Sequence, residues 1–324
     1  MSLKNEIIST LEKNRERSVS GEYLAQKLSV SRSAIWKAIG LLKKEGYGID
    51  AFRNRGYRLS EGVDVLSEEG IMLFLKPERL PAKLIVFKTV DSTNREAKKM
   101  AVAGGAHGTV LLADEQTSGR GRFERSFFSP AHTGIYMSFI LKPRMAVSDA
   151  TLITVAAAVA VCRAISGHAK LSPRIKWVND IILDGKKICG ILTESILDFE
   201  SGSVSDVILG IGLNFSTPDD AFPDEFKGRV GSLYPKNTPP FTRNEMAAAI
   251  IDNLLDIYES LTAREFISEY KELSCLMNRE ISYSDGDAEK RATVVDIDEA
   301  GRLVVRDADG IVSALSSGEV GVHL

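Results

Sequence analysis

The sequence predicts an α+β protein of several domains: a winged helix-turn-helix at the N-terminus, an α/β domain with one large sheet in the centre, and a small β-barrel at the C-terminus. Three observations lead to this fold class. Helical periodicity and a basic hairpin occupy the first 62 residues, strand and helix patterns alternate through the middle, and short strands with Asp-Gly turns fill the end. The 324 residues suffice for two or three domains. We expect the divisions 1–62, 63–83 as a linker, 84–273 and 274–324.

The composition is that of an ordinary globular protein, with 44% hydrophobic and 26% charged residues. No apolar run reaches the length of a membrane span, and the N-terminus has no signal-peptide pattern. The three cysteines, Cys162, Cys189 and Cys275, are odd in number and scattered in apolar contexts, which disfavours a disulfide framework. We therefore expect a cytoplasmic protein with no membrane partner and no zinc site.

Three short helices are predicted at the start of the chain. Apolar residues at helical spacing mark the first helix between Leu3 and Leu11. Ser20 can cap the second helix and Ser31 the third, which Gly46 is placed to end. Two short strands then flank Arg53-Asn54-Arg55-Gly56, which suits a hairpin turn. This order is the layout of a winged helix-turn-helix.

The N-terminal region is basic, whereas the rest of the chain is acidic. Residues 1–60 hold 12 Lys/Arg and 6 Asp/Glu, and the remaining residues hold 29 and 38. A recognition helix contacts DNA through its N-terminal residues, and a basic wing can contact phosphates. The predicted DNA-binding residues are Ser31, Arg32, Ser33, Trp36, Lys37, Arg53 and Arg55. The pattern also fits a solvated basic face on a protein-interaction domain, and Trp36 alone would fit a core position. Since a module of this size usually needs a second copy on an operator, we expect a dimer.

The central region alternates strand and helix patterns. The expected strands are Leu84–Val90, Thr109–Ala113, Ile135–Leu141, Ile175–Val178, Ile188–Glu194 and Val207–Asn214. The expected helices are Asn94–Ala103, Asp149–Ile165 and Arg243–Leu261, and a brief helix near Ser67–Leu75 precedes them. Together they indicate an α/β domain with one large sheet.

The chain changes character after about Cys275. Short strands are expected at Glu280–Tyr283, Arg291–Ile297, Leu303–Arg306, Val312–Leu315 and Val320–His323. Asp-Gly and Ala-Gly turns separate most of them, and this even spacing is typical of a small β-barrel.

The most distinctive loop is Gly119-Arg120-Gly121-Arg122, directly after a predicted strand. Glycine lets a backbone approach a ligand closely, and the planar fork of arginine suits phosphate or carboxylate. The loop therefore fits a device that closes over an anion. Taken alone, it fits a flexible basic turn equally well.

Four further short stretches, called islands below together with the Gly119–Arg122 loop, are unusually polar or glycine-rich for their positions. They are Asp91-Ser92-Thr93-Asn94, Lys176-Trp177-Val178-Asn179-Asp180, the stretch from Gly185 to Leu192, and Gly210-Ile211-Gly212-Leu213-Asn214. The first island opens a helix, where its side chains can cap the helix or hold a polar ligand. Alternate glycines in a strand clear space on one face for a ligand or another backbone.

The five islands in this order, DSTN, GRGR, KWxND, KxxG and GxGxN, resemble those of the biotin protein ligases. With the basic winged head, the chain is similar to the bifunctional type that also represses biotin operons, and the match spans nearly the whole chain. The resemblance implies a central domain like a class II aminoacyl-tRNA synthetase with a mixed sheet, and an SH3-like C-terminal barrel. It also implies two reactions. Biotin and Mg-ATP form biotinyl-5′-adenylate and pyrophosphate, and the adenylate then acylates one lysine of the biotin carboxyl carrier protein of acetyl-CoA carboxylase.

The resemblance assigns roles to residues of this chain. Lys187, Arg122 and Arg120 would be catalytic, because cations bring together a carboxylate and an α-phosphate and stabilise developing charge. Biotin would bind Ser92, Thr93, Asn94, Gln116, Gly119, Arg120, Arg122, Lys187, Gly190, Leu192, Gly210 and Gly212. ATP would bind Arg120, Arg122, Arg125, Lys176, Asn179, Lys187 and Asn214. Asp180 is a candidate ligand for Mg²⁺, which would come with ATP, and no tightly bound prosthetic group is implied. Further implied partners are operator DNA and a second subunit when adenylate is bound.

The loop departs from the family pattern at two positions. Glu124 replaces a glycine and Phe127 replaces a tryptophan, so we expect the loop to close differently here. Val178 stands where the family has proline in KWPND, and His323 stands where some relatives have arginine.

Three competing functions remain open at this point. A lipoate ligase shares the adenylate chemistry, but the winged head and GRGR favour biotin. A DNA-binding biotin sensor without ligase activity is disfavoured because Lys187, Arg120 and Arg122 are retained. A ligase whose head no longer binds DNA is disfavoured by the polar start of the third helix.

Overall fold

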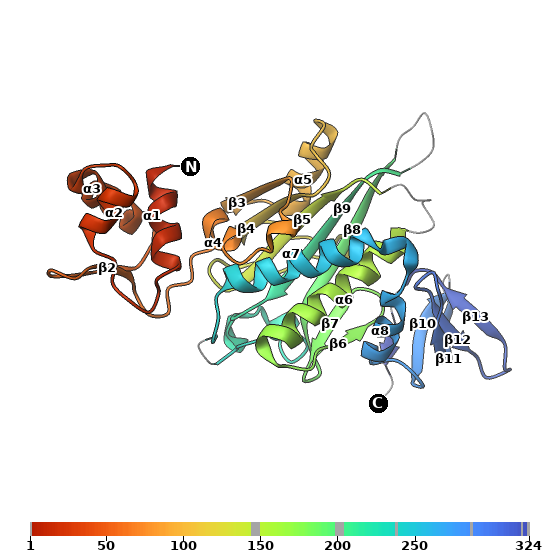
Figure 1. The fold of residues 1–324 in the computed structure, drawn as a ribbon. Coiled ribbons are helices and arrows are strands. Elements are labelled where there is room, and N and C mark those ends of the chain that lie inside the picture. The colour runs from red at the N-terminus through yellow and green to blue at the C-terminus, as the bar shows by residue number, and fades with distance from the viewer. Residues whose placement is uncertain are drawn as a thin grey trace. The chain divides into compact units, whose positions relative to one another are not determined.

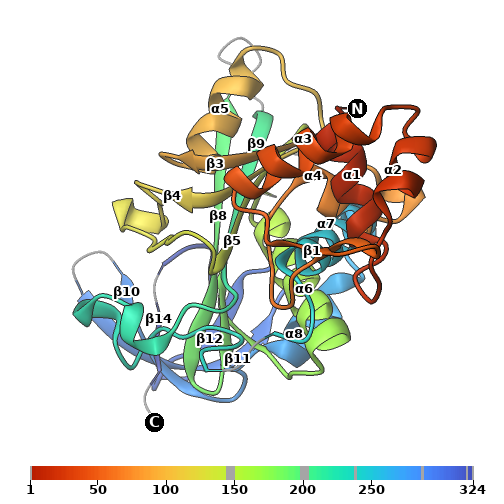
Figure 2. The same cartoon turned by 90° about the vertical axis from the view of Figure 1, so that its left-hand side faces the viewer.

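A computed structural model of the chain describes residues 2–143, 150–197, 204–236, 239–285, 288–318 and 320–322. The chain divides into two compact units, Met1–Leu80 with Phe241–Ala249, and Pro81–Pro240 with Ile250–Leu324. Figures 1 and 2 show the ribbon from two directions. The predicted helix start at Asp149 and the predicted strand end at His323 lie outside the described residues.

The first unit begins with the predicted order of three helices and a hairpin, which is confirmed. The elements are α1 (Leu3–Glu12), α2 (Gly21–Lys27), α3 (Arg32–Lys44), β1 (Ile49–Phe52) and β2 (Gly56–Leu59). The hydroxyl of Ser20 accepts a hydrogen bond from the Tyr23 amide, and that of Ser31 accepts one from Ala34. Gly46 follows α3 with a φ of 103°, which favours glycine. Local capping therefore sets both ends of α3.

The rest of the first unit consists of the segment up to Leu80, which includes most of the predicted linker, and of Phe241–Ala249, which includes the start of α7 (Arg243–Glu259). A short helix, α4 (Glu68–Met72), is capped by the Ser67 hydroxyl. The side chain of Arg243 is fully buried and bonds the carboxylate and the carbonyl of Asp64. Asn244 donates to the Val65 carbonyl and accepts from the Ser67 amide. These bonds tie the segment after the hairpin to residues almost 180 positions later.

The second unit is built on a seven-stranded sheet. Its strands are β3 (Lys83–Val90), β4 (Thr109–Gln116), β5 (Gly134–Leu141), β6 (Arg174–Lys176), β7 (Asp180–Leu183), β8 (Lys186–Leu197) and β9 (Val204–Asn214). Their order across the sheet is β3-β4-β5-β9-β8-β7-β6. Only β3 and β4 run parallel among these described pairs, so the expected mixed sheet is confirmed.

Helices cover both faces of this sheet. The helix α5 (Thr93–Val102) packs on β4, β5 and β9. In Figure 2 this helix lies next to β3, the edge strand of the sheet. On the other face α6 (Ala150–Ala169) packs on β8, and α8 (Phe266–Leu273) packs on α6 (Figure 1). Among the described helices, α6 alone is long and apolar enough to cross a membrane. However, 72% of its apolar window is buried in the protein, as in a core helix.

The five predicted C-terminal strands are present. They are β10 (Glu280–Asp285), β11 (Ala288–Ile297), β12 (Leu303–Arg306), β13 (Val312–Leu315) and β14 (Val320–Val322). They form one antiparallel sheet in the order β13-β12-β11-β10-β14. The Trp177 indole donates to the Gly301 carbonyl at 2.9 Å, which ties this sheet to the central one. Trp177 itself is buried, at 3% exposed.

Among the described α-helices and β-strands, two were missed by the sequence analysis. The strand β7 follows a turn at residues 177–179, so the expected strand Ile175–Val178 ends earlier, at Lys176, and a second strand that was not expected begins at Asp180. The helix α8 has only eight residues, so its apolar residues are too few to establish a helical period in the sequence. Its packing on α6 stabilises it.

Candidate functional site

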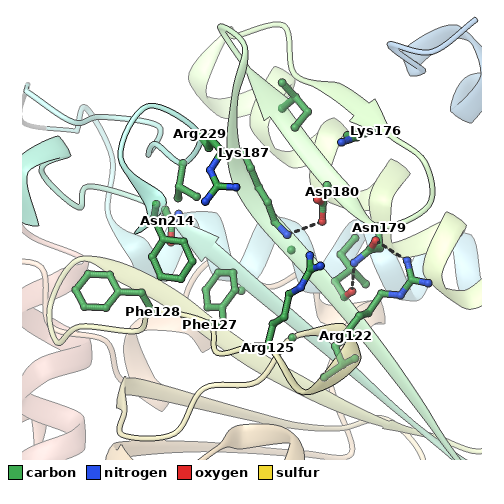
Figure 3. Close-up of a pocket in the computed structure, with 18 of the residues that line it drawn as sticks. Arg122, Arg125, Phe127, Phe128, Lys176, Asn179, Asp180, Lys187, Asn214 and Arg229 are labelled. Carbon is green, nitrogen blue, oxygen red and sulfur yellow. Dashed lines mark hydrogen bonds and ion pairs between the residues drawn. The ribbon is translucent and has the colours of Figure 1, made fainter. Parts of the chain in front are cut away.

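A cavity of about 1130 Å³ opens in the second unit, and its lining includes all but one of the predicted ligand residues (Figure 3). Those in the lining are Ser92, Thr93, Asn94, Gln116, Arg120, Arg122, Arg125, Lys176, Asn179, Asp180, Lys187, Gly190, Leu192, Gly210, Gly212 and Asn214. The exception is Gly119, which is buried. Its carbonyl accepts a hydrogen bond from the Phe127 amide, and a Cβ at this position would collide with Phe127 and Ser129. Residues from five separated islands thus meet at one place.

The floor of the cavity is one face of the sheet. Lys176 lies opposite Asp180, Asp180 opposite Gly190, and Gly190 opposite Gly212. Opposed residues in antiparallel strands point to the same face, so these four form a row across β6, β7, β8 and β9. Two glycines in the middle of the row remove side chains from the floor, and this leaves room for the cavity.

A β-bulge places Lys187 on the same face. Ile181 pairs with Cys189, but Ile182 pairs with Lys187, so β8 carries one extra residue at Ile188. Without this bulge, strict alternation would put Lys187 on the face opposite Gly190. With it, the Lys187 ammonium enters the cavity and lies 2.6 Å from an oxygen of Asp180.

One end of the cavity is polar and buried. The Gln116 side-chain oxygen accepts hydrogen bonds from the amide (2.8 Å) and hydroxyl (3.1 Å) of Thr93. The Gln116 amide donates to Ser129. Ser92 occupies the cap position of α5 but makes no side-chain capping bond. Of the two roles open for this island, helix capping by Ser92 is therefore not the one observed.

Asn94, which is predicted to contact biotin, lines the cavity and also contacts two neighbouring strands. Its amide donates to Glu194 at 2.8 Å, and its oxygen accepts from the Ser138 hydroxyl at 2.6 Å. A Cβ on Gly210 would collide with the Asn94 side chain. Gly210 is thus needed to seat Asn94, which braces α5 against the sheet.

The glycine at 212 makes room for Phe127. A Cβ there would lie 2.6 Å from the Phe127 ring, and a Cβ on Gly190 would lie 3.3 Å from it. The ring also meets Tyr136 edge-on with centroids 6.4 Å apart. Phe127 therefore lies over the glycine floor, next to the lysine that Figure 3 shows beside it.

The arginine loop forms a tight hairpin over the cavity. The backbones of Arg120 and Ser126 pair in an isolated antiparallel β-bridge. The Gly121 amide donates to the Arg125 carbonyl at 2.7 Å. The turn residues Phe123 and Glu124 have φ of 54° and 58°, a conformation that favours glycine or asparagine. Arg122 donates to the Asn179 side chain at 3.2 Å, and its guanidinium lies 5.0 Å from the Phe123 ring centroid.

The opposite end of the cavity carries an unsatisfied acceptor. Asn214 is 2% exposed and donates to the Gly231 carbonyl at 2.9 Å. Its side-chain oxygen has no hydrogen-bond partner among the described residues. A buried acceptor without a partner is costly, which suits a group that receives a donor from a ligand.

The cavity is strongly basic. Its lining holds eight Lys/Arg and three Asp/Glu, which suits a polyanion. No cluster of three His, Cys, Asp or Glu within the described ranges could hold a metal ion by itself. Mg²⁺ often binds through one or two carboxylates and substrate phosphates, and Asp180 is one such carboxylate, already paired with Lys187.

The cysteines are not part of a reactive site. Cys162 and Cys189 are buried behind the sheet, and burial raises the pKa of Cys162 to about 12 and that of Cys189 further. Cys275 lines the cavity, and burial raises the pKa of its thiol as well. The thiolate needed for nucleophilic attack is therefore scarce at neutral pH.

The predicted DNA-binding residues are all exposed on the N-terminal unit. Trp36 is 69% exposed on α3, so it is not a core residue. Arg32, Ser33 and Lys37 are exposed on the same helix, and Ser31 also caps it. Arg53 and Arg55 are exposed at the tip of the β1–β2 hairpin. These positions match a recognition helix and a basic wing.

Comparison with known proteins finds three family models along the chain. Residues 4–58 match an HTH domain, residues 86–214 the biotin/lipoate A/B protein ligase family, and residues 277–321 the biotin protein ligase C-terminal domain. The bifunctional ligase/repressor BirA of Bacillus spizizenii is 38% identical over 79% of this chain and 77% of its own length. This chain belongs to the BirA family. The Escherichia coli member is 26% identical over 94% of this chain and 92% of its own.

Solved structures agree with membership of the BirA family. The biotin protein ligase from Aquifex aeolicus in complex with biotin and ATP is 26% identical, with a TM-score of 0.62, over 75% of this chain and 99% of that one. The ligase from Leishmania major in complex with biotinyl-5-AMP is also 26% identical, with a TM-score of 0.50, over 74% and 100% of the two chains.

The sequence analysis missed several cavity residues of this BirA family member. Arg174, Arg229 and Arg279 line the cavity beside the predicted cations. Arg174 stands two positions before Lys176 on β6, so strand alternation could have revealed it. Arg229 and Arg279 lie in segments without a motif, and nothing in their local sequence marks them.

Proposed function

We propose that this protein is an ATP-dependent biotin protein ligase that also represses transcription from biotin operons in response to biotin. The observation that carries the ligase activity is the convergence of Lys187 and Arg125, which Figure 3 shows side by side. They lie in a cavity that also holds Gly190, Gly212 and the polar Gln116. Membership of the BirA family, whose named members are ligase/repressors, supports both activities. The exposed basic face of α3 and the wing supports DNA binding.

The first step joins two anions. A biotin carboxylate oxygen forms a bond to the α-phosphorus of Mg-ATP, and the bond to the β-phosphate breaks, so pyrophosphate leaves with the electron pair. Lys187 and the loop arginines offset the repulsion between carboxylate and phosphate and stabilise the charge that develops. In the second step a carrier lysine attacks the mixed anhydride, AMP leaves and an amide forms.

The cavity suits this order of substrates. Biotin would take the end that holds Ser92, Thr93, Gln116 and the Gly119–Arg120 backbone, with its tail along Gly190, Leu192, Gly210 and Gly212. The nucleotide would take the side of Lys176, Asn179 and Asn214. Arg120, Arg122 and Arg125 would then cover the adenylate, since a mixed anhydride hydrolyses in water. Mg²⁺ would arrive with ATP and contact Asp180.

We also propose the finer architecture. The central sheet with its helices corresponds to a class II synthetase-like domain at 84–273, and the C-terminal sheet to an SH3-like barrel at 274–324. The head spans 1–62, followed by a linker at 63–83. The partners are the biotin carboxyl carrier protein, operator DNA and a second subunit when adenylate is bound, in the cytoplasm.

Two alternatives differ in what they predict for the same assay. A lipoate ligase would use lipoate and leave the carrier unbiotinylated, while a sensor without ligase activity would bind biotin and form no adenylate. The decisive experiment incubates the full chain with biotin, Mg-ATP and a carrier domain. Labelling of one carrier lysine is expected, and no labelling would reject the ligase. In an electrophoretic mobility-shift assay on biotin-operon DNA, the same DNA binding with and without biotin and ATP would reject a biotin-coupled repressor.

A further inference from the structure

The outer face of α3 carries one continuous stripe of exposed positions. Ser33, Trp36, Lys37 and Gly40 are all exposed, and they follow one another at the spacing i, i+3, i+4 and i+7. Positions with this spacing lie on the same face of a helix, and recognition helices use such a face to reach base edges in the major groove. The buried residues of α3 occupy the opposite face, so the stripe points away from the core of the N-terminal unit.

Gly40 is the one position of this stripe without a side chain. Inside a helix, glycine shifts the folding equilibrium about fivefold toward the unfolded state relative to alanine. A Cβ added at Gly40 would meet no atom within 4 Å, and Gly40 does not have a positive φ. Neither packing nor backbone conformation among the described residues therefore requires glycine here. Close approach of a partner to the helix backbone would account for it.

The position one turn before Gly40 on this face holds an indole. Trp36 is 69% exposed, and it is the largest side chain among the described exposed hydrophobic residues. A single exposed hydrophobic residue is ordinary, but Trp36 and Gly40 are neighbours at i and i+4. Together they form a recess with an apolar wall, which we call the notch.

The charge around the notch identifies the partner as a polyanion. Arg32 and Lys37 lie in the first half of α3, and the whole helix contains no acidic residue. Within the described ranges neither of these cations forms an ion pair. The hairpin tip adds two exposed arginines. This charge and the groove-reading spacing of the stripe fit the major groove of duplex DNA.

The notch suits one particular group in that groove. Its floor lacks a single Cβ, so the space that it offers is about the size of a methyl group. The C5-methyl group of thymine is the apolar group that bases display in the major groove. The other base edges present hydrogen-bond donors and acceptors there, which the face of an indole does not satisfy.

We propose that Gly40 admits a thymine methyl group of the operator, which packs against Trp36, so that the notch reads a thymine directly. The inference rests on the proposed repressor function and deepens it by naming the base that α3 recognises. The cations beside the notch supply salt-dependent affinity, and the notch supplies sequence preference.

The test exchanges one methyl group between protein and DNA. The full chain, with biotin and Mg-ATP, is titrated with biotin-operon DNA that contains either thymidine or deoxyuridine, which lacks only the C5-methyl group. Wild type should bind the deoxyuridine duplex about fourfold more weakly for each methyl group that leaves a notch. Gly40→Ala fills the notch, so it should bind the thymidine duplex about five- to tenfold more weakly than wild type does. Its preference for thymidine should vanish or reverse, because deoxyuridine leaves room for the alanine methyl group.

Gly167→Ala is the matched control. Gly167 is an exposed glycine of α6, and a Cβ added there would also meet no atom within 4 Å. This variant should keep the affinity and the thymidine preference of wild type. Trp36→Phe should keep the preference and Trp36→Ala should lose it, since phenylalanine retains an apolar wall. The change in preference between variant and wild type separates the notch from thymines that are read elsewhere.

A second measurement shows that weaker binding does not come from a damaged helix. Native-state hydrogen exchange of the α3 amides in the full chain should slow in Gly40→Ala, because alanine is the better helix former. Stability and operator binding should therefore change in opposite directions in this one variant.

Three results would overturn the inference. Gly40→Ala could bind the thymidine duplex as tightly as wild type does, or it could lose the same affinity on both duplexes. Trp36→Ala could keep the thymidine preference and instead change the oligomeric state of the protein, which would make this face a protein contact. A wild-type chain that binds no biotin-operon DNA would reject the proposed repressor function as well.

Discussion

The ammonium of Lys187 lies 2.6 Å from the carboxylate of Asp180, and the two reach each other across β7 and β8 because of the bulge at Ile188. This ion pair holds the lysine over the cavity. Under the proposed ligase function, the lysine would turn from Asp180 to a carboxylate and a phosphate, because a single ion pair at a partly exposed site is weak.

Lys187→Ala should lower kcat/KM for adenylate formation about a hundredfold or more, on the order of 3 kcal/mol of transition-state stabilisation. Pyrophosphate release measures this step. Lys186→Ala is the matched control, since the neighbouring Lys186 pairs with Asp219 at 2.9 Å. Equal rates for the two variants would remove Lys187 from the reaction.

Arg122→Gly should let biotinyl-5′-adenylate escape and biotinylate bystander proteins. Arg122 bonds Asn179 across the cavity, so its loss opens the loop that covers the intermediate. Labelling of added serum albumin at fixed adenylate output measures the leak. Arg302→Gly, at an exposed arginine of the C-terminal sheet that pairs with Asp298, is the control and should label no more than wild type. An unchanged leak in Arg122→Gly would mean that this loop does not retain the adenylate.

Glu124→Gly should raise the free energy of unfolding by about 0.5–1 kcal/mol. Replacing the L-residue at positive φ removes a strain of about 1–2 kcal/mol, but glycine loses more backbone entropy on folding, and this loss cancels part of the gain. Urea unfolding of the domain that contains the loop measures the change. Lys227→Gly is the control, since Lys227 is exposed with a φ of −53° and should lose stability. Destabilisation by Glu124→Gly would show that the carboxylate makes a contact that outweighs the strain.

Arg55→Gln should weaken operator binding about three- to tenfold at 0.1 M salt and reduce the salt slope by about one, as expected for one lost phosphate contact. Titrations of operator DNA at several salt concentrations measure both. Lys44→Gln at the far end of α3 removes the same charge and should change neither. A similar loss in both variants would show a general charge effect in place of a wing contact.

The sequence determined the order of the elements and all the longer helices and strands, but not β7 and α8, because periodicity, caps and turn residues act over a few positions. Ser20, Ser31 and Gly46 set helix ends locally, and the apolar runs became strands of one sheet. The five islands also pointed to one cavity, and each contributes residues to its lining.

The tertiary structure alone decided which side chains face one another. Alternation by itself puts Lys187 behind the sheet, and only the bulge opposite Ile181 and Ile182 turns it to Asp180. The glycines at 210 and 212 line the cavity, and only the packing shows that they also make room for the Asn94 side chain and the Phe127 ring. Arg279 joins Lys176 only because Ser274 pairs with β6, a contact between residues about a hundred positions apart. Such long-range pairings depend on how whole elements pack, and no local pattern encodes them.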